Sequence, residues 1–344
     1  MHNYIEDKLK LRFVAFGFII CLLAVSFTAS QAQKLDIDYT LPENVKGVFK
    51  KKEYKFIIDQ TINTISKRHK VVAVKNGAIV FNAEGDLANF NFYDLLYKCT
   101  DYGKKSEWET VIDDYVNSVL SSIEARNQID LYNFETIKDR LAIRLYPEYT
   151  FARYDSLDQL IYRSDLEGVY SMLMLDLPET FSPIYKEMFE AWNVSEDDCF
   201  KIAQQNINKQ DVHKEQYELE TFTGDSIKMY FLANDDYAAS YVLGLQNNSP
   251  ELVGDWGSIV AIPNKGIVNL CPISKDNAFD FVPFIQRLIP VISQFHDQHP
   301  QPVSKDFYWY YKGEFTKVNL SQDEHGNTTV IAPYGLGELM TVQE

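Results

Sequence analysis

Four pairs of strand-like segments in this chain are joined by turns that are too short to hold a helix. Residues 71–75 meet residues 78–81 across Asn76-Gly77, a dipeptide that accepts the positive φ angles of a tight hairpin turn. The other turns lie at 165–168, near Gly224 and at 263–266. Only antiparallel strands can be joined so closely, and helical patterns occur between the pairs. The sequence therefore predicts an α+β fold of mostly antiparallel sheets with packed helices, rather than βαβ units.

The order of these patterns suggests where the chain divides. We predict a signal peptide at 1–32, a loose lead-in at 33–50 and an N-terminal segment of helices and a β-hairpin at 51–130. A main α+β domain follows at 131–300. Residues 301–344, which contain the aromatic run FYWYYKGEF, are expected to form a C-terminal β-hairpin extension or appendage.

The N-terminus has the three parts of a secretory signal. Lys8, Lys10 and Arg12 precede an uncharged apolar run at 13–29, and Ser30-Gln31-Ala32 supplies the small residues of a cleavage site. We expect cleavage before Gln33 and export to the periplasm or the cell exterior. Retention as a membrane anchor is the alternative. No later apolar run is long enough to span a membrane, so we expect no membrane span after cleavage.

The chain is acidic, with 49 Asp and Glu against 33 Lys and Arg and a formal net charge of −16. Removal of residues 1–32, which hold three basic and two acidic residues, makes this −17. Such a charge repels phosphate backbones and anionic lipid heads. Nucleic-acid binding, and membrane binding through basic residues, are therefore disfavoured.

Three cysteines follow the predicted signal: Cys99, Cys199 and Cys271. Because their number is odd, at least one thiol is free or pairs between chains. All three lie in apolar patterns, where a buried free thiol is the commonest arrangement.

Residues 54–295 resemble the YtpQ-like family of uncharacterised proteins, although the family pattern has no signal peptide. The resemblance is carried by the order of VVAVKNGAIVFN, NFYDLLYKC, IRLYPEYTF, VYSMLMLDLP, SEDDCFKIAQQNIN, NDDYAASYVLGL and IVAIPNKGIVNL. It implies an α+β fold but no reaction.

Two polar segments of this stretch are candidate ligand sites. Asp235, Asp236 and Tyr237 follow Asn234 at a predicted helix start, where their side chains either hold a cation or a substrate hydroxyl or act as ordinary helix caps. Asn264 and Lys265 lie in the hairpin tip at 263–266, where Lys265 either meets an anionic ligand or belongs to an ordinary turn.

Asp176 ends an apolar strand, and Trp309 and Tyr311 share one face of the aromatic run; these are the remaining candidates. Asp176 is either catalytic or a cap, and the aromatic side chains either form a binding surface or pack in the core.

No motif for a metal site, nucleotide loop or nucleophilic triad is present, and no cofactor is indicated. We therefore predict a non-catalytic envelope protein that binds a protein or small-molecule ligand. The alternative is a carboxylate-based envelope hydrolase using Asp176, Asp235 and Asp236.

Overall fold

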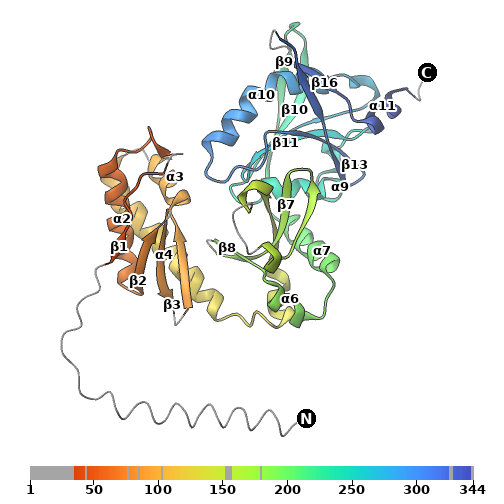
Figure 1. Cartoon of the computed structure of the whole chain (residues 1–344). Coiled ribbons are helices and arrows are strands. Elements are labelled where there is room, and N and C mark those ends of the chain that lie inside the picture. Colours follow the sequence, from red (N-terminus) through yellow and green to blue (C-terminus); the bar gives the residue numbers. More distant parts are fainter. Residues whose placement is uncertain are drawn as a thin grey trace, which may run out of the picture.

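The computed structural model describes residues 35–42, 45–75, 77–83, 86–101, 104–151, 157–178, 180–324 and 328–341. The predicted signal peptide lies outside these residues, as does Asn76 of the first hairpin turn. Helices and strands pack in several sheet-and-helix layers, which confirms the predicted α+β class (Figure 1). Among the described strand pairs, only β1 with β2 is parallel.

The N-terminal unit, which ends with α4, is a four-stranded sheet in the order β1-β2-β3-β4 with helices against it. Its elements are β1 (Asp36–Ile37), α2 (Lys51–Ser66), β2 (Lys70–Lys75), β3 (Ala78–Ala83), β4 (Asp86–Asn91), α3 (Tyr93–Asp101) and α4 (Trp108–Asn127). They bury one core, which includes Ile57, Phe81 and Leu120. The hairpin predicted around residues 76–77 is confirmed, because Lys75 pairs with Ala78.

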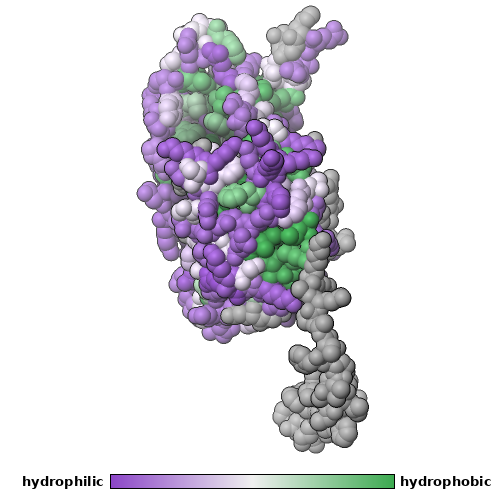
Figure 2. Space-filling view, turned by 90° about the vertical axis from the view of Figure 1, so that its left-hand side faces the viewer, coloured by the Kyte–Doolittle hydropathy of each residue, from purple (hydrophilic) through white to green (hydrophobic). Residues whose placement is uncertain are grey.

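The lead-in predicted as loose is part of this unit. Ile37 in β1 pairs with Val74, and Phe49 packs into the core at 6% exposure. The opposite face of the sheet is partly open, since Val72 is 46% and Leu87 67% exposed. Figure 2 shows a hydrophobic area on this side of the molecule.

A second four-stranded sheet, in which β7 pairs with β5, β6 and β8, follows the N-terminal unit. Its part of the chain contains α5 (Phe134–Ile137), β5 (Leu141–Pro147), β6 (Tyr162–Leu166), β7 (Val169–Leu177), β8 (Thr180–Pro183), α6 (Lys186–Trp192) and α7 (Glu196–Ile207). Ser182-Pro183 has the pattern of a helix start, but residues 180–183 pair with β7 and the helix begins at Lys186.

The third layer is a six-stranded sheet in the order β14-β13-β11-β12-β10-β9. The elements are β9 (His213–Glu220), β10 (Ser226–Ala233), α8 (Ala238–Tyr241), α9 (Leu245–Asn248), β11 (Ser258–Asn264), β12 (Ile267–Pro272), α10 (Phe281–Gln298), β13 (Phe307–Tyr311), β14 (Glu314–Lys317), β15 (Asn319–Gln322), β16 (Thr328–Ile331) and α11 (Tyr334–Thr341).

Both faces of the six-stranded sheet are buried at its central strands, whereas the edge strand β9 is exposed. One face shares the largest core with the β5–β8 sheet and α7, and the other is covered by α10 and α11. The β13–β14 hairpin forms one edge of this sheet, since β13 pairs with β11 and β14 pairs with β13. Residues 307–311 are thus an integral part of the sheet, and the separate C-terminal pair is β15 with β16.

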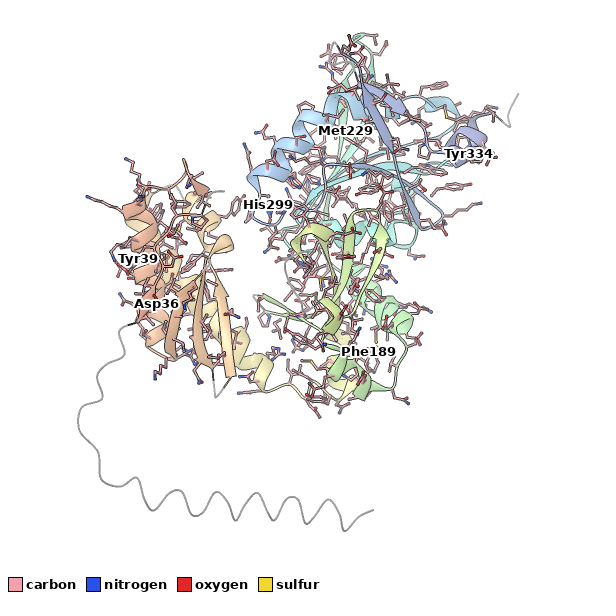
Figure 3. The ribbon with its side chains drawn as sticks, viewed as in Figure 1. Asp36, Tyr39, Phe189, Met229, His299 and Tyr334 are labelled. Carbon is pink, nitrogen blue, oxygen red and sulfur yellow. The ribbon has the colours of Figure 1, made fainter. Side chains whose placement is uncertain are left out.

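The N-terminal unit contacts the rest of the chain through α3 and through α4, which lies beside β7. Arg126 Nε donates to Ser182 Oγ at 2.9 Å. The rings of Tyr97 and His299 lie 5.6 Å apart, and Figure 3 shows His299 on the side that faces this unit. Within the described residues, no helix is both long and apolar enough to cross a membrane.

Candidate functional site

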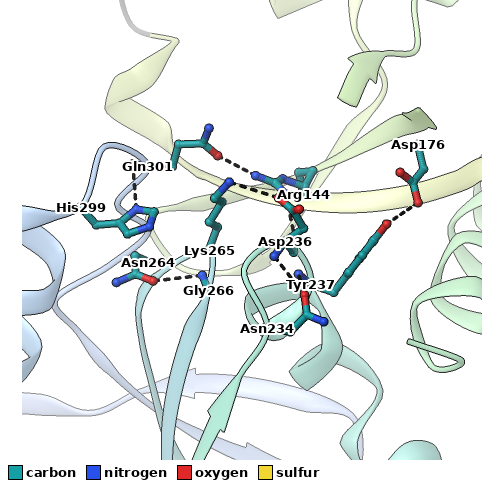
Figure 4. Close-up of polar contacts among 10 residues, drawn as sticks. All are labelled: Arg144, Asp176, Asn234, Asp236, Tyr237, Asn264, Lys265, Gly266, His299 and Gln301. Carbon is teal, nitrogen blue, oxygen red and sulfur yellow. Dashed lines mark hydrogen bonds and ion pairs between the residues drawn. The ribbon is translucent and has the colours of Figure 1, made fainter. Parts of the chain in front are cut away.

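The turn after β10 is shaped by the side chain of Asn234. Its Oδ1 accepts hydrogen bonds from the backbone N–H groups of Asp236 and Tyr237, both at 3.0 Å (Figure 4). An asparagine side chain that accepts hydrogen bonds from the backbone N–H groups two and three residues later stabilises a local turn. The helix predicted from residues 234–236 begins later, at Ala238, with Tyr237 at its N-cap and no side-chain cap bond, so Asn234 shapes the preceding turn and holds Asp236 and Tyr237 in place.

The tip of the β11–β12 hairpin is bound to this turn through the backbone. Asn234 N donates to Gly266 O at 3.1 Å, and Ala239 N donates to Lys265 O at 3.0 Å. Asn264 is 1% exposed; its Oδ1 accepts from Gly266 N and its Nδ2 donates to Phe295 O. Asn264 thus shapes the tip and is not available to a ligand, which corrects its prediction as a ligand contact.

Asp236 is shared by two cations. Lys265 Nζ lies 3.1 Å from Asp236 Oδ1, and Arg144 Nη1 lies 3.3 Å from the same oxygen and donates to Asp236 O at 2.8 Å. The guanidinium also donates to Gln301 Oε1 at 2.6 Å and lies 4.4 Å from the ring of Phe181. The side chain of Arg144 is 5% exposed, whereas that of Asp236 is 46% exposed, so the cluster opens to solvent at the carboxylate.

These contacts decide the charge state of Asp236. Burial opposes ionisation, but the charges of Lys265 and Arg144 outweigh it and lower the pKa of the carboxyl. Asp236 is therefore an ionised anchor for two cations and is poorly suited to donate a proton.

Asp176 has the opposite environment. It ends β7, where burial raises the pKa of its carboxyl and the charge of Asp236 adds to the rise. The hydroxyl of Tyr237 donates to Asp176 Oδ2 at 2.5 Å, which lowers that pKa in part. Burial, followed by this hydrogen bond to an anionic partner, raises the pKa of Tyr237. The two aspartates thus have pKa values that are shifted in opposite directions.

An open pocket of about 540 Å³ lies beside this pair. Asp176, Tyr237, Arg140, Asp139 and Gln210 contribute to its lining. The pocket thus combines a partly buried carboxyl, a phenol and a guanidinium. Tyr237 in its lining directly follows Asp236, which binds the two cations.

The structure separates three predicted residues from this cluster. Asp235 is exposed, and its backbone lies beside Gly266 of the hairpin tip. Trp309 is 7% exposed, donates through Nε1 to Trp256 O at 2.7 Å and stacks on Tyr311 at 5.0 Å. Because both rings pack against the α10 side of the sheet, the prediction that they form a ligand surface is corrected to core packing.

Sequence reasoning missed Arg144, Arg140 and Gln301. Arg144 had a usable signal, because it interrupts the apolar run Ala142-Ile143-Arg144-Leu145. A cation inside a buried strand needs an anionic or polar partner. Gln301 lies in a polar loop that is typical of any surface connection, so nothing in the sequence distinguished it.

Within the part of the chain that the structure describes, no three His, Cys, Asp or Glu side chains are grouped to hold a metal ion. Cys99, Cys199 and Cys271 are buried and free. Comparisons with protein-family models, with curated proteins and with solved structures found no match. The YtpQ-like resemblance stays a prediction.

Proposed function

We propose that this chain is a non-catalytic ligand-binding protein of the cell envelope, and that Lys265, supported by the positive charge of the buried Arg144, holds an anionic group of its ligand. One observation carries the proposal: two cations converge on the single carboxylate of Asp236. These two cations face the single carboxylate of Asp236, and Lys265 can be reached from solvent in an otherwise acidic chain.

The donors of Lys265 support this assignment. Its ammonium has three N–H donors, and Asp236 takes one of them. The side chain is 19% exposed, so an anion can reach it without unfolding the hairpin tip. The neighbouring pocket at Asp176, Tyr237 and Arg140 offers space for the remainder of the ligand.

Thermal unfolding with inorganic phosphate and succinate as probe anions tests the proposal, with chloride used to match ionic strength. Because a ligand that binds only the folded state raises Tm, both probes should raise the Tm of the wild type but not of Lys265→Gln. Lys305→Gln is the matched control, since Lys305 is a partly exposed lysine paired with Asp297. An equal rise in all three proteins, or no rise in the wild type, would contradict the proposal.

The second candidate is a carboxylate-based hydrolase, because the pKa values of Asp176 and Asp236 are shifted apart. Opposite shifts are expected of a general acid and its ionised partner. Hydrolysis of chromogenic glycosides or of peptidoglycan that is lost in both Asp176→Asn and Asp236→Asn would favour it. Activity that survives in either variant, or no activity in the wild type, would count against it.

A further inference from the structure

The negative charge of this protein is not spread evenly along the chain. Residues 35–127 hold 13 Lys and Arg against 14 Asp and Glu, whereas residues 128–344 hold 16 against 33. The N-terminal unit is therefore almost neutral, and nearly the whole net charge belongs to the rest of the chain. Repulsion of anionic partners, expected from the overall charge, thus applies to only part of the molecule.

Within the N-terminal unit, lysines gather at the end where α2 and α4 begin. We define the lysine face by Lys46, Lys50, Lys51, Lys52, Lys104 and Lys105. Two described contacts bring its halves together: Lys105 pairs with Glu53 in the first turn of α2, and Phe49 packs 5.8 Å from Trp108 at the start of α4. All six lysines are exposed.

The acidic side chains nearby leave positive charge in excess. Glu53 is paired with Lys105, and Glu107 lies 4.0 Å from Lys104. Among the described residues, no carboxylate lies within ion-pair distance of Lys50, Lys51 or Lys52. The side chains of Lys50, Lys51 and Lys52 are exposed, although Lys50 also attracts Glu53, so this segment can meet a surface of opposite charge.

An exposed apolar residue lies among these lysines. Gly47 has a φ of 93°, and the turn that it allows is held by hydrogen bonds from Val48 N and Phe49 N to Val45 O. Phe49 anchors the turn in the core, which leaves Val48 outside at 61% exposure. On α2, Phe56 follows Lys52 by one turn and is 42% exposed.

We propose that the lysine face binds a lipid surface that contains anionic phospholipids. Ammonium groups ringing an exposed apolar side chain match the boundary between headgroups and acyl chains, where lysine meets phosphate and valine leaves water. An acidic protein surface would account for the lysines alone. A lipid surface also accounts for the exposed side chains of Val48 and Phe56, so we favour the membrane. The acidic remainder of the chain is repelled by the same surface, so the N-terminal unit faces the lipid.

Vesicle co-sedimentation tests this inference. The protein used is the chain from Gln33 onward, which keeps every described residue and lacks the apolar run at 13–29. The probes are phosphatidylcholine vesicles with and without phosphatidylglycerol. The wild type should bind only the vesicles with phosphatidylglycerol, and high salt should release it. Lys50→Gln, Lys51→Gln and Lys52→Gln together should lower the partition coefficient roughly 100-fold, because each lysine near an anionic surface contributes about a fivefold gain.

The matched control carries Lys201→Gln, Lys228→Gln and Lys275→Gln, three exposed lysines of the acidic part with the same total change in charge. It should bind like the wild type. Val48→Gln should weaken binding while leaving the charge unchanged. Equal binding by both triple variants would overturn the inference, as would wild-type binding to neither vesicle. The wild type could instead self-associate in a salt-dependent way without binding vesicles. If the Lys50–Lys52 variant lost this self-association, the lysine face would be assigned to contact with a second copy of the chain.

Discussion

The phenolic hydroxyl of Tyr237 donates a hydrogen bond of 2.5 Å to Asp176 Oδ2, which joins the turn after β10 to the end of β7. One residue earlier, Asp236 binds Arg144 of β5 and Lys265 of the β11–β12 hairpin. Two neighbouring side chains thus connect the four-stranded β5–β8 sheet to the six-stranded sheet. The candidate site is therefore also a structural junction, so its variants need stability controls.

Tyr237→Phe removes the hydroxyl and leaves Asp176 without this donor. We expect a loss of about 1–2 kcal/mol in the free energy of unfolding, measured by urea denaturation at pH 7, because the bond goes to a partly buried carboxylate. Tyr217→Phe is the matched control, since its hydroxyl bonds Glu215 on an exposed strand. The control should lose less than about 0.5 kcal/mol. Equal losses of unfolding free energy in the two variants would show that the hydrogen bond to Asp176 stabilises the fold no more than an exposed one does.

Asp176→Asn and Asp236→Asn should show opposite pH dependence. The raised pKa of Asp176 means that the folded state prefers its protonated form. The advantage of the wild type over Asp176→Asn should therefore shrink as pH rises from about 3.8 through the higher folded pKa. The lowered pKa of Asp236 has the reverse effect, because its advantage is full above 3.8 and is lost as pH falls through the folded pKa.

Urea unfolding from pH 3 to pH 7 measures both differences in unfolding free energy. Parallel pH trends in the two variants would contradict the assigned environments.

Arg144→Met should cost more than Lys265→Met. Arg144 is buried, and its loss removes the hydrogen bonds that it donates to Asp236 O and Gln301 Oε1, so we expect about 3 kcal/mol or more. Lys265 is partly exposed, and its loss should cost about 1 kcal/mol or less. Chemical denaturation measures the loss of unfolding free energy in each variant. A larger loss for Lys265→Met than for Arg144→Met would contradict the assignment of Arg144 as the more stabilising cation.

The thiols of Cys99, Cys199 and Cys271 should be inert in the folded protein. Burial raises the pKa of Cys99 and Cys271 to about 12 and of Cys199 to about 11, so the reactive thiolate is scarce at neutral pH. Mass spectrometry of the chain from Gln33 after maleimide treatment should show no adduct in buffer and three in guanidinium. Rapid labelling of the native protein would show that a thiol is accessible.

Local patterns predicted much of the fold. The hairpins before Ala78 and after Lys265 depend on turn residues and alternation within a few positions, and the structure confirms both. The sequence patterns did not predict β4 and β8. Short strands with polar residues resemble loops, and each of these two pairs with a strand whose own sequence pattern is stronger. A helix predicted from a capping box at Ser106 instead begins at Trp108 after a short 3-10 turn.

The turns of the candidate site could be predicted from the sequence, but the side chains that contact these turns from distant parts of the chain could not. Asn234 and Lys265 lie in turn motifs that the chain displays locally. Arg144 reaches Asp236 across 92 positions of sequence, and such a contact has no local pattern. Trp309 was misassigned because an aromatic strand reads the same whether its rings are exposed or packed.

Native against denaturing mass spectrometry, on protein purified from the envelope of its own host, tests the central claim most directly. The account predicts a denatured mass that begins at Gln33. Under native conditions it predicts an additional anionic ligand on the wild type and on Lys305→Gln, absent from Lys265→Gln. A bare wild type, or the same retained ligand on Lys265→Gln, would contradict the assignment of Lys265, supported by the charge of Arg144, as the residue that holds the anion.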